Sequence, residues 1–274
     1  MAGMPAKRAG LRLNDLTGYF RGFKGAVVAF SGGVDSSVVA AAAFIALGER
    51  SVAVTVASEF LPDSEIRQAA SVAGVIGIRH EVLRLSVLGD EKISSNPPDR
   101  CYHCKKGDFG AILEIAKKRG FDVFDGTNAD DARTRRPGLK ALSEMGIKSP
   151  LRELGIGKEE VREIARGMKL PNSERPSSPC LASRFPYGMT ITESDLERVG
   201  QAEEFLRSLG YTELRVRHHG NLARIELPAG EMPLILASGH REKIVAKLLS
   251  LGYNYVALDL KGFRSGSMDE VLPS

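Results

Sequence analysis

A short apolar stretch at residues 26–30 runs directly into a turn of small and hydroxyl residues that could bind phosphate. Residues 31–37 read Ser-Gly-Gly-Val-Asp-Ser-Ser. Two adjacent glycines let the backbone turn sharply and expose its N–H groups, and a helix that begins next adds unpaired N–H groups and the positive end of its dipole. No Gly-Lys-Ser or Gly-Lys-Thr follows, so this is not a Walker A loop. The pattern predicts a different phosphate cradle; the alternative is an ordinary glycine-rich turn between a strand and a helix.

The turn at residues 31–37 resembles the SGGxDS loop of the ATP pyrophosphatases, also called PP-loop enzymes. The resemblance implies that ATP is cleaved between its α- and β-phosphates and that pyrophosphate is held in the loop. Asp35 is expected to hold Mg²⁺ or to position phosphate. The residues expected to contact the nucleotide here are Ala29, Ser31, Gly32, Gly33, Asp35, Ser36 and Ser37.

Two other strand ends carry residues suited to a nucleotide. Residues 124–131 read Phe-Asp-Gly-Thr-Asn-Ala-Asp-Asp, and small side chains there let a ligand approach the backbone. Asp130 or Asp131 could hold Mg²⁺ together with phosphate oxygens, with Asp131 as the candidate, or could cap a helix instead. Another predicted strand ends near residue 57, where the adenine or ribose is expected. The candidates for nucleotide contact at these two ends are Gly126, Thr127, Asn128 and Thr55.

The chain has three cysteines, an odd number that does not favour a disulfide framework. Cys101 and Cys104 form a Cys-x-x-Cys pair at the start of a predicted helix, and Cys180 lies in a proline-rich loop. Three thiolates suit a [4Fe–4S] cluster that keeps one iron free of a protein ligand. A zinc site would need a fourth ligand, and a thioredoxin-like redox pair would use only the first two cysteines. The residues alone leave these alternatives open.

These candidate residues need a scaffold that brings strand ends together. Short apolar stretches alternate with helical patterns along the first part of the chain. The predicted strands are residues 25–30, 51–57, 79–85 and 121–125, and the predicted helices are residues 35–47, 63–75, 101–118 and 157–168. Such alternation is typical of an α/β fold, in which a parallel sheet is covered on both faces. The ligand is then expected at the carboxyl ends of the strands.

A loop rich in proline at residues 170–189 separates this part from a second one. Thr192 and Asp195 form a capping pattern for a helix that ends near residue 209. The other predicted elements are strands at residues 213–217, 222–227 and 254–260 and a helix at residues 241–251. We therefore predict two domains. Residues 1–189 carry the parallel sheet and the phosphate loop, and residues 190–274 form a smaller α+β domain for substrate binding or oligomerisation.

The composition narrows the class of protein. Of the 274 residues, 43% are hydrophobic and 26% are charged, as in soluble globular proteins. The longest apolar run, residues 38–47, is too short to span a bilayer, and the first residues lack the apolar core of a secretory signal. We therefore expect a cytoplasmic protein that does not bind membranes. The net charge of +4 gives little support for nucleic-acid binding.

Several motifs occur together in a specific order. They are residues 31–37, 100–105 (RCYHCK), 126–131 (GTNADD), 179–188 (PCLASRFPYG), 215–220 (RVRHHG) and 258–267 (LDLKGFRSGS). With these motifs the chain resembles the LarE-type ATP-dependent sulfur transferases, which help to make the nickel-pincer nucleotide cofactor. The PP-loop alone indicates only the superfamily and its adenine nucleotide α-hydrolase-like fold. The PCLASR loop and the C-terminal motifs narrow the resemblance to this family.

The resemblance implies a reaction in two steps. A carboxylate of a pyridinium dicarboxylate mononucleotide attacks the α-phosphate of ATP and releases pyrophosphate, and the acyl-adenylate then becomes a thiocarboxylate with loss of AMP. One branch of the family uses a cysteine matching Cys180 as a sacrificial sulfur donor that ends as dehydroalanine. The other branch holds a [4Fe–4S] cluster on cysteines matching Cys101, Cys104 and Cys180, and its free iron carries a sulfide. Sacrificial members generally lack the Cys-x-x-Cys pair, so we expect the cluster branch, supplied by a sulfide donor.

The resemblance also assigns residues around the substrate. Arg215, Arg217 and Arg264 match positions near the substrate phosphate, and a planar guanidinium suits phosphate. The alternative for each is an arginine on a strand surface. The residues expected to act in catalysis are Asp35, Cys180 and Arg184. Arg184 could instead brace its own loop. The family further suggests a homo-oligomer.

Three rival functions stay open at this point. A tRNA thiolase also joins a PP-loop to a cluster, but it normally carries a basic RNA-binding appendage, and none is evident in the sequence. An amide-forming ligase such as NAD synthetase would not need the three cysteines. A non-enzymatic nucleotide or iron–sulfur sensor would release no pyrophosphate.

Overall fold

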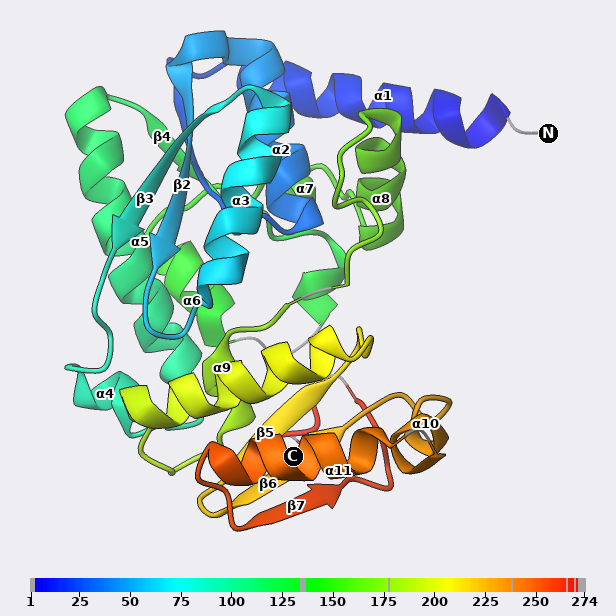
Figure 1. The fold of residues 1–274 in the computed structure, drawn as a ribbon. Helices are drawn as coiled ribbons and strands as arrows, with labels where there is room; N and C mark the ends of the chain where they lie inside the picture. Colours follow the sequence, from blue (N-terminus) through cyan, green and yellow to red (C-terminus); the bar gives the residue numbers. More distant parts are fainter. Residues whose placement is uncertain are drawn as a thin grey trace. The chain divides into compact units, whose positions relative to one another are not determined.

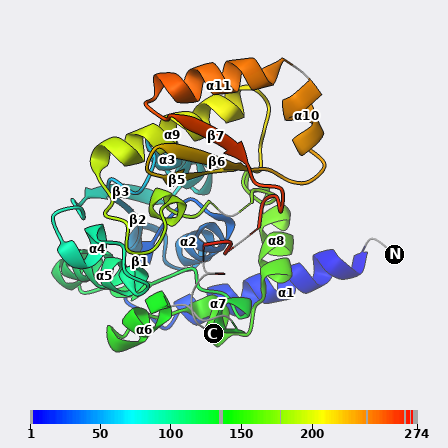
Figure 2. The same cartoon turned by 90° about the horizontal axis from the view of Figure 1, so that it is seen from below.

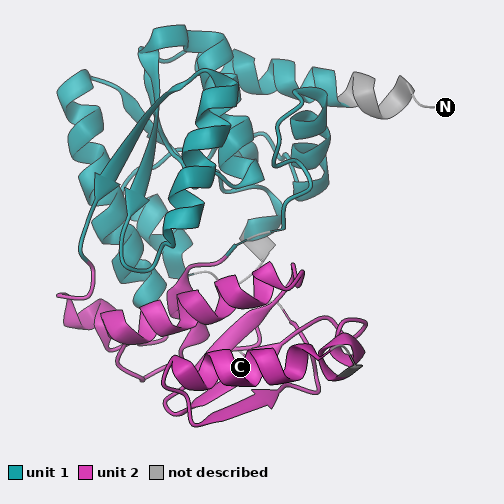
Figure 3. Cartoon of the chain, viewed as in Figure 1, with its two compact units in different colours: residues 1–86, 99–178 teal, residues 87–98, 179–274 magenta. Residues whose placement is uncertain are grey.

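The computed structural model describes residues 3–133, 137–176, 178–237, 239–264, 266–268 and 270 (Figure 1). Ser265, which belongs to the last motif, lies outside these ranges. The chain divides into two compact units, which Figure 3 shows in separate colours. One unit comprises residues 1–86 and 99–178, and the other comprises residues 87–98 and 179–274. The functional division at residue 189 stays a prediction.

A four-stranded parallel sheet forms the centre of the first unit, with the strand order β3-β2-β1-β4. Its strands are β1 (Ala26–Ala29), β2 (Ser51–Ala57), β3 (Arg79–Arg84) and β4 (Asp122–Phe124). The central strand pairs on both sides, because Ala26 lies opposite Ser51 of β2 and opposite Asp122 of β4. The predicted α/β fold with a parallel sheet is confirmed.

Helices cover both faces of this sheet, as Figure 2 shows for the first unit. Alternate side chains of β1 divide between two hydrophobic cores: Ala26 and Val28 pack in one, and Val27 packs in the other. The helices of the first core are α1 (Gly3–Phe20), α2 (Val34–Leu47), α3 (Asp63–Ile76) and α8 (Lys158–Gly167), and those of the second are α5 (Arg100–Arg119) and α6 (Pro137–Glu144). Shorter helical segments are η1 (Gly48–Arg50), η2 (Asp130–Arg133) and α7 (Pro150–Glu153).

The sequence analysis did not predict helix α1. Its sequence includes three glycines and a proline, which are poor helix formers. Leu16 and Phe20 are nevertheless fully buried in the core that contains α2 and α8. Tertiary packing therefore stabilises this helix more than its own sequence does.

The second unit contains a smaller sheet of three strands. β5 (Arg215–His219) and β6 (Leu222–Glu226) form an antiparallel hairpin, and β7 (Tyr255–Leu258) pairs parallel to β6. Its helical elements are α4 (Glu91–Ser94), η3 (Leu181–Arg184), α9 (Glu193–Ser208), α10 (Met232–Ala237) and α11 (His240–Ser250). Thr192 begins α9 as predicted, because its hydroxyl accepts a hydrogen bond from the Asp195 N–H at 3.2 Å. This is the second, smaller α+β part.

Residues 87–98 belong to the second unit although most of their sequence neighbours belong to the first. Asn96 is fully buried, and its side-chain amide donates to the carbonyls of Phe185 and Pro186 at 3.2 and 2.7 Å. The Ile191 N–H donates to the Ser94 carbonyl at 2.7 Å. These long-range bonds hold the segment beside the PCLASR loop, which sequence proximity could not indicate. Within the ranges that the structure describes, no helix has the length and apolar character needed to cross a bilayer.

Candidate functional site

The phosphate loop lies at the point where the order of the parallel strands reverses. Along the chain, β1 is followed by β2 and β3, which lie on one side of it, and then by β4, which lies on the other side of β1. The loops that follow β1 and β4 meet closely: a Cβ added to Gly126 would lie 2.7 Å from the Ser36 nitrogen. A crevice of this kind, outside the carboxyl ends of the strands, is where open α/β sheets bind their ligands. Only glycine at position 126 allows this approach.

Glycine geometry and hydroxyl contacts shape the loop itself. Gly32 has a φ of +71°, and a Cβ there would lie 2.8 Å from Cα of Ala69 in α3. The hydroxyls of Ser36 and Ser37 donate to the Gly33 carbonyl at 3.0 and 2.9 Å. Gly33 is the N-cap of α2 and supplies no capping side chain. The first N–H groups of α2 are therefore left for a ligand, which favours an anion at this helix end.

Asp35 is held by two residues distant in sequence. Asn128 donates its side-chain amide to Asp35 Oδ1 at 3.0 Å, and the Lys158 ammonium group forms an ion pair with Asp35 Oδ2. The side chains of Asp35 and Lys158 keep 23% and 35% of their exposure, so both can reach a ligand. The sequence analysis placed residue 158 in a helix but assigned it no function. Lys158 adds a cation to a loop that lacks the lysine of a Walker A motif.

Asn128 also organises the turn after β4. Its side-chain oxygen accepts from the N–H groups of Asp130 and Asp131 at 2.9 and 3.2 Å, and its own N–H donates to Asp131 Oδ2 at 3.1 Å. Asp130 accepts from the Lys158 N–H at 2.8 Å, at the start of α8. These contacts are of the capping kind that was the alternative for both aspartates. A magnesium role for Asp131 stays a prediction.

The remaining nucleotide candidates make local contacts near the strand ends. The Thr55 hydroxyl donates to the Phe30 carbonyl at 2.6 Å, just before the phosphate loop. Thr127 donates its hydroxyl to Asp125, whose other carboxylate oxygen is buried without a partner among the described residues. Asp125 was not among the predicted site residues. Its position directly after β4 was the available signal.

The three cysteines form no disulfide and divide between the units. Cys101 and Cys104 are the second and fifth residues of α5, a spacing that places both thiols on one helix face. Cys180 precedes η3 in the second unit and is half-buried. The described residues contain no group of three or more Cys, His, Asp or Glu side chains gathered as a metal site. Two thiols one turn apart suit a shared cluster, and the joining of Cys180 to them stays a prediction.

Arg184 braces the loop that carries Cys180. Its guanidinium forms a bidentate pair with Glu203 of α9, with both N–O distances at 2.8 Å. A third nitrogen donates to the carbonyls of Pro179 and Cys180 at 2.8 and 3.1 Å. Arg184 is 1% exposed. The observed contacts are those of the loop-bracing alternative, and a catalytic role for Arg184 stays a prediction.

Glu203 is the buried acceptor at the centre of this brace. Burial alone would raise the pKa of Glu203, but the charges of Arg184 and Arg207 and the hydrogen bonds from Arg184 and Val216 together outweigh it, and the pKa is lowered. The carboxylate also accepts from Arg207 at 2.9 Å and from the Val216 N–H at 3.1 Å. Because Val216 lies in β5, Glu203 ties the cysteine loop to the strand that carries two candidate arginines.

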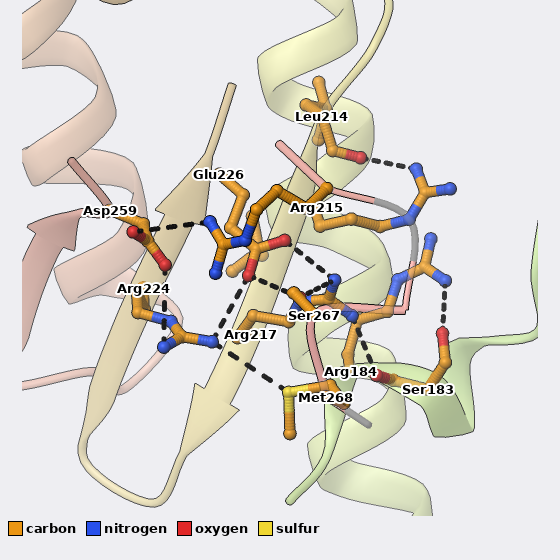
Figure 4. Close-up of polar contacts among 12 residues, drawn as sticks. Ser183, Arg184, Leu214, Arg215, Arg217, Arg224, Glu226, Asp259, Ser267 and Met268 are labelled. Atoms are coloured by element: carbon orange, nitrogen blue, oxygen red, sulfur yellow. Dashed lines mark hydrogen bonds and ion pairs between the residues drawn. The ribbon is translucent and has the colours of Figure 1, made fainter. Parts of the chain in front are cut away.

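The candidate arginines of β5 differ in their partners (Figure 4). Arg217 has several partners: it donates to Glu226 and Ser267, each at 2.7 Å, and to the Ser183 carbonyl at 2.8 Å, while its Nε has no partner among the described residues. Arg215 is 8% exposed and donates to the Leu214 carbonyl at 2.6 Å, with no carboxylate partner among the described residues. Burial and the nearby charge of Arg184 lower the pKa of Arg215 to about 10.

No described carboxylate pairs directly with the buried Arg215 guanidinium, although the charge of Glu203 acts on it, and such a guanidinium is a favourable place for an anion. The Arg215 guanidinium lies 5.0 Å from the centre of the Phe263 ring, which belongs to the last motif. Arg264 of the same motif is more exposed and pairs with Glu270 at 2.7 Å. The sequence analysis did not single out Arg224, which bridges Glu226 and Asp259 at 3.2 and 3.6 Å. Its place on the strand paired with β5 was the only signal.

Known proteins match the chain over most of its length. It is 42% identical over 262 residues to an uncharacterised protein of Synechocystis sp., and this match covers 95% of this chain and 98% of that protein. It is 41% identical over 247 residues to pyridinium-3,5-bisthiocarboxylic acid mononucleotide synthase of Lactiplantibacillus plantarum, which covers 89% of each. A tRNA-specific 2-thiouridylase of Leptospira biflexa is 30% identical over 212 residues, and this match covers 62% of the chain and 56% of that protein.

The profile of the NAD synthase family matches residues 16–93, a range that holds β1 to β3 and the phosphate loop. This partial match agrees with the PP-loop superfamily, whereas the match to the mononucleotide synthase extends through both units. The chain belongs to the family of pyridinium-3,5-bisthiocarboxylic acid mononucleotide synthase, the LarE-type branch of the PP-loop enzymes.

Proposed function

We propose that this protein is an ATP-dependent sulfur transferase that converts a carboxylate of a pyridinium dicarboxylate mononucleotide to a thiocarboxylate. The observation that carries the proposal is the 41% identity, over 89% of both chains, to a protein named for the bisthiocarboxylic product. The phosphate loop at the strand reversal, with Asp35 and Lys158 beside it, supports an ATP site. The match to a tRNA thiolase is shorter and supports the superfamily only.

The first step activates the substrate. A carboxylate oxygen forms a bond to the α-phosphorus of ATP, the bond from that phosphorus to the bridging oxygen breaks, and pyrophosphate leaves with the electron pair. The N–H groups at the start of α2 and the Lys158 ammonium group would stabilise the negative charge of the leaving pyrophosphate. Asp35 and Asp131 would hold Mg²⁺, whose chemistry is to neutralise phosphate oxygens.

The second step transfers sulfur. A sulfur nucleophile adds to the acyl carbon, the carbon–oxygen bond to AMP breaks, and the thiocarboxylate remains. Cys101, Cys104 and Cys180 would hold a [4Fe–4S] cluster, which supplies an iron without a protein ligand and thus a place to bind sulfide. Arg184 and Glu203 would keep the Cys180 loop in one conformation during this step.

The cellular setting follows from the same proposal. The protein would act in the cytoplasm, where free thiols such as these stay reduced. A sulfide donor would resupply the sulfur after each turnover. A homo-oligomer is proposed from the family alone.

Product analysis tests the proposal directly. Anaerobically reconstituted wild-type protein with ATP, Mg²⁺, sulfide and the dicarboxylate mononucleotide should form AMP and pyrophosphate in equal amounts, because cleavage lies between the α- and β-phosphates and sulfur transfer then releases AMP. Separation of the nucleotides by ion-exchange chromatography, together with a pyrophosphate assay, measures both products. ADP and inorganic phosphate as the main products would exclude the proposed chemistry. Pyrophosphate release without any thiocarboxylate would favour an amide-forming ligase or another acyl-adenylate enzyme.

Arg215 is expected to bind the substrate phosphate. Arg215→Ala should raise KM for the mononucleotide about 10- to 100-fold, since a charge-assisted bond to phosphate is lost. The KM for ATP should not change. Arg215 is preferred to Arg217 because removal of Arg217 would also break its buried ion pair with Glu226, and that loss would affect folding.

Arg241→Ala is the matched control, because Arg241 lies in the same unit and pairs with Glu242 on the surface. This variant should keep both KM values. Steady-state kinetics with each substrate varied in turn gives the comparison. An equal rise in KM for ATP and for the mononucleotide in Arg215→Ala would place this arginine at the nucleotide instead.

A further inference from the structure

The segment that follows α8 sends one side chain into the base of the phosphate loop. Asn172 is 1% exposed, and its side-chain nitrogen donates to the Gly32 carbonyl at 2.7 Å and to the Ser37 hydroxyl at 2.9 Å. These bonds span 140 and 135 positions of sequence and lie within the first unit. Neither the sequence motifs nor the comparisons assign a role to this residue.

The chemistry of its partners defines how the Asn172 amide is oriented. The Gly32 carbonyl can only accept, so the NH₂ group of Asn172 must face it. The Ser37 hydroxyl donates its own hydrogen to the Gly33 carbonyl at 2.9 Å and therefore accepts from Asn172. A chain of bonds thus runs from Asn172 through Ser37 to Gly33, and a second bond holds Gly32.

These bonds determine the direction of the N–H groups in the loop. In a trans peptide the carbonyl and the following N–H point in opposite directions. A Gly32 carbonyl held toward Asn172 therefore directs the Gly33 N–H to the other side, and a Gly33 carbonyl held by Ser37 does the same for the Val34 N–H. The Gly33 N–H donates to the Ser31 hydroxyl of the loop at 3.3 Å, and the Val34 N–H lies at the entrance of α2, where an anion is favoured.

The other end of the amide has no partner within the described residues: Asn172 Oδ1 is buried without a hydrogen bond. A buried acceptor of this kind destabilises the fold, and an apolar side chain would avoid that cost. The advantage of asparagine over an apolar residue must therefore lie in the two hydrogen bonds that its side-chain nitrogen donates to the phosphate loop. We infer that Asn172 is a positioning residue that sets the N–H groups of the phosphate loop for the pyrophosphate portion of ATP. This inference rests on the proposed ATP site.

Binding measurements with two probes test the inference. Inorganic pyrophosphate probes the loop, and adenosine probes the nucleoside part of the site. Asn172→Ala should weaken pyrophosphate binding about 10-fold, because two buried loop acceptors lose their donor, while the Kd for adenosine stays the same. Asn172→Asp keeps the shape but replaces the donor with a charged acceptor, so pyrophosphate binding should weaken about 100-fold. Isothermal titration calorimetry on the full chain gives each Kd.

Arg175→Ala is the matched control. Arg175 anchors the same segment to Glu65 of α3 at 2.7 Å and does not touch the phosphate loop. This variant should bind pyrophosphate like the wild type, which separates loosening of the segment from loss of the loop bonds.

The outcomes separate this inference from the proposed function. If the wild type binds no pyrophosphate, the proposed ATP site itself fails. If the wild type binds pyrophosphate and both Asn172 variants bind it equally well, only the inference fails. Equal weakening of pyrophosphate and adenosine binding would also overturn it, because that indicates a general structural role. If Asn172→Ala does not fold, the shape-conserving Asn172→Asp variant decides.

Discussion

Asp35→Asn should lower the rate of pyrophosphate release about 100-fold or more, with little change in folding. The asparagine side chain retains one oxygen for Asn128 but loses the charge that pairs with Lys158 and that would hold Mg²⁺. Loss of one preorganised electrostatic group at a transition state typically has an effect of about two orders of magnitude or more. Single-turnover mixing with ATP and the mononucleotide, followed by a pyrophosphate assay, measures the rate.

Asp63→Asn is the control for this prediction. Asp63 is also an acidic residue in the first turn of a helix of the same unit, but it is exposed at the start of α3. Its replacement should leave the rate of pyrophosphate release unchanged. A wild-type rate in Asp35→Asn would contradict the assignment of Asp35 to the phosphates or to Mg²⁺. Equal losses in both variants would indicate a general effect of negative charge in this unit.

The parallel sheet was predictable because its signals are local. Each strand is a short apolar stretch, and β1 buries side chains on both faces, as Ala26, Val27 and Val28 show. The order of motifs also placed the loops after β1 and β4 at one edge of the sheet. The observed contact between Gly126 and Ser36 agrees with that placement. The spacing of apolar residues and the positions of the glycines were therefore sufficient to predict this sheet and the loops at its edge.

The partners of the loop could not be predicted in the same way. Lys158 and Asp35 are separated by 123 positions, and Asn172 and Gly32 by 140. A lysine at the start of a helix and an asparagine in a loop are common on protein surfaces, so their residue types carry no signal. Only the packing of α8 and the following segment against α2 and the loop brings them into place. Arg184 shows the same limit, because its buried partner Glu203 lies 19 positions away in α9, and nothing in its residue type indicates the pairing.

The brace around Cys180 has a consequence for sulfur chemistry. Arg184 binds the carbonyl of Cys180 itself, and Glu203 connects that arginine to β5 and thus to Arg215 and Arg217. A loop held in this way keeps its backbone in place while its thiol changes ligand or bonding state. The same arrangement serves a cysteine that stays a cluster ligand through many turnovers and a cysteine that donates its sulfur once. Experiment must therefore distinguish the two.

Each single Cys→Ala variant at positions 101, 104 and 180 should lose sulfur transfer completely but keep pyrophosphate release near the wild-type rate. The thiols lie outside the phosphate loop, so adenylation does not need them, whereas a three-cysteine cluster needs all three. Anaerobically reconstituted wild type should carry about four iron atoms per chain, and each variant should lose them. Iron counting, visible absorbance and a thiocarboxylate assay on the same samples give the comparison.

Mass spectrometry after turnover decides between the two sulfur sources. With sulfide supplied, the wild type should complete more than one turnover, and Cys180 should keep its sulfur. In the sacrificial chemistry, the Cys180 thiolate would attack the acyl carbon and displace AMP. A base would then remove the Cα proton as the Cβ–S bond breaks, which leaves the sulfur on the product as a thiocarboxylate and dehydroalanine at position 180. Loss of H₂S from the mass of Cys180 after one turnover, with Cys101→Ala fully active, would overturn the cluster. The sequence argues against that outcome, because the sacrificial chemistry uses only Cys180. It would leave Cys101 and Cys104, two thiols on one helix face, without a function.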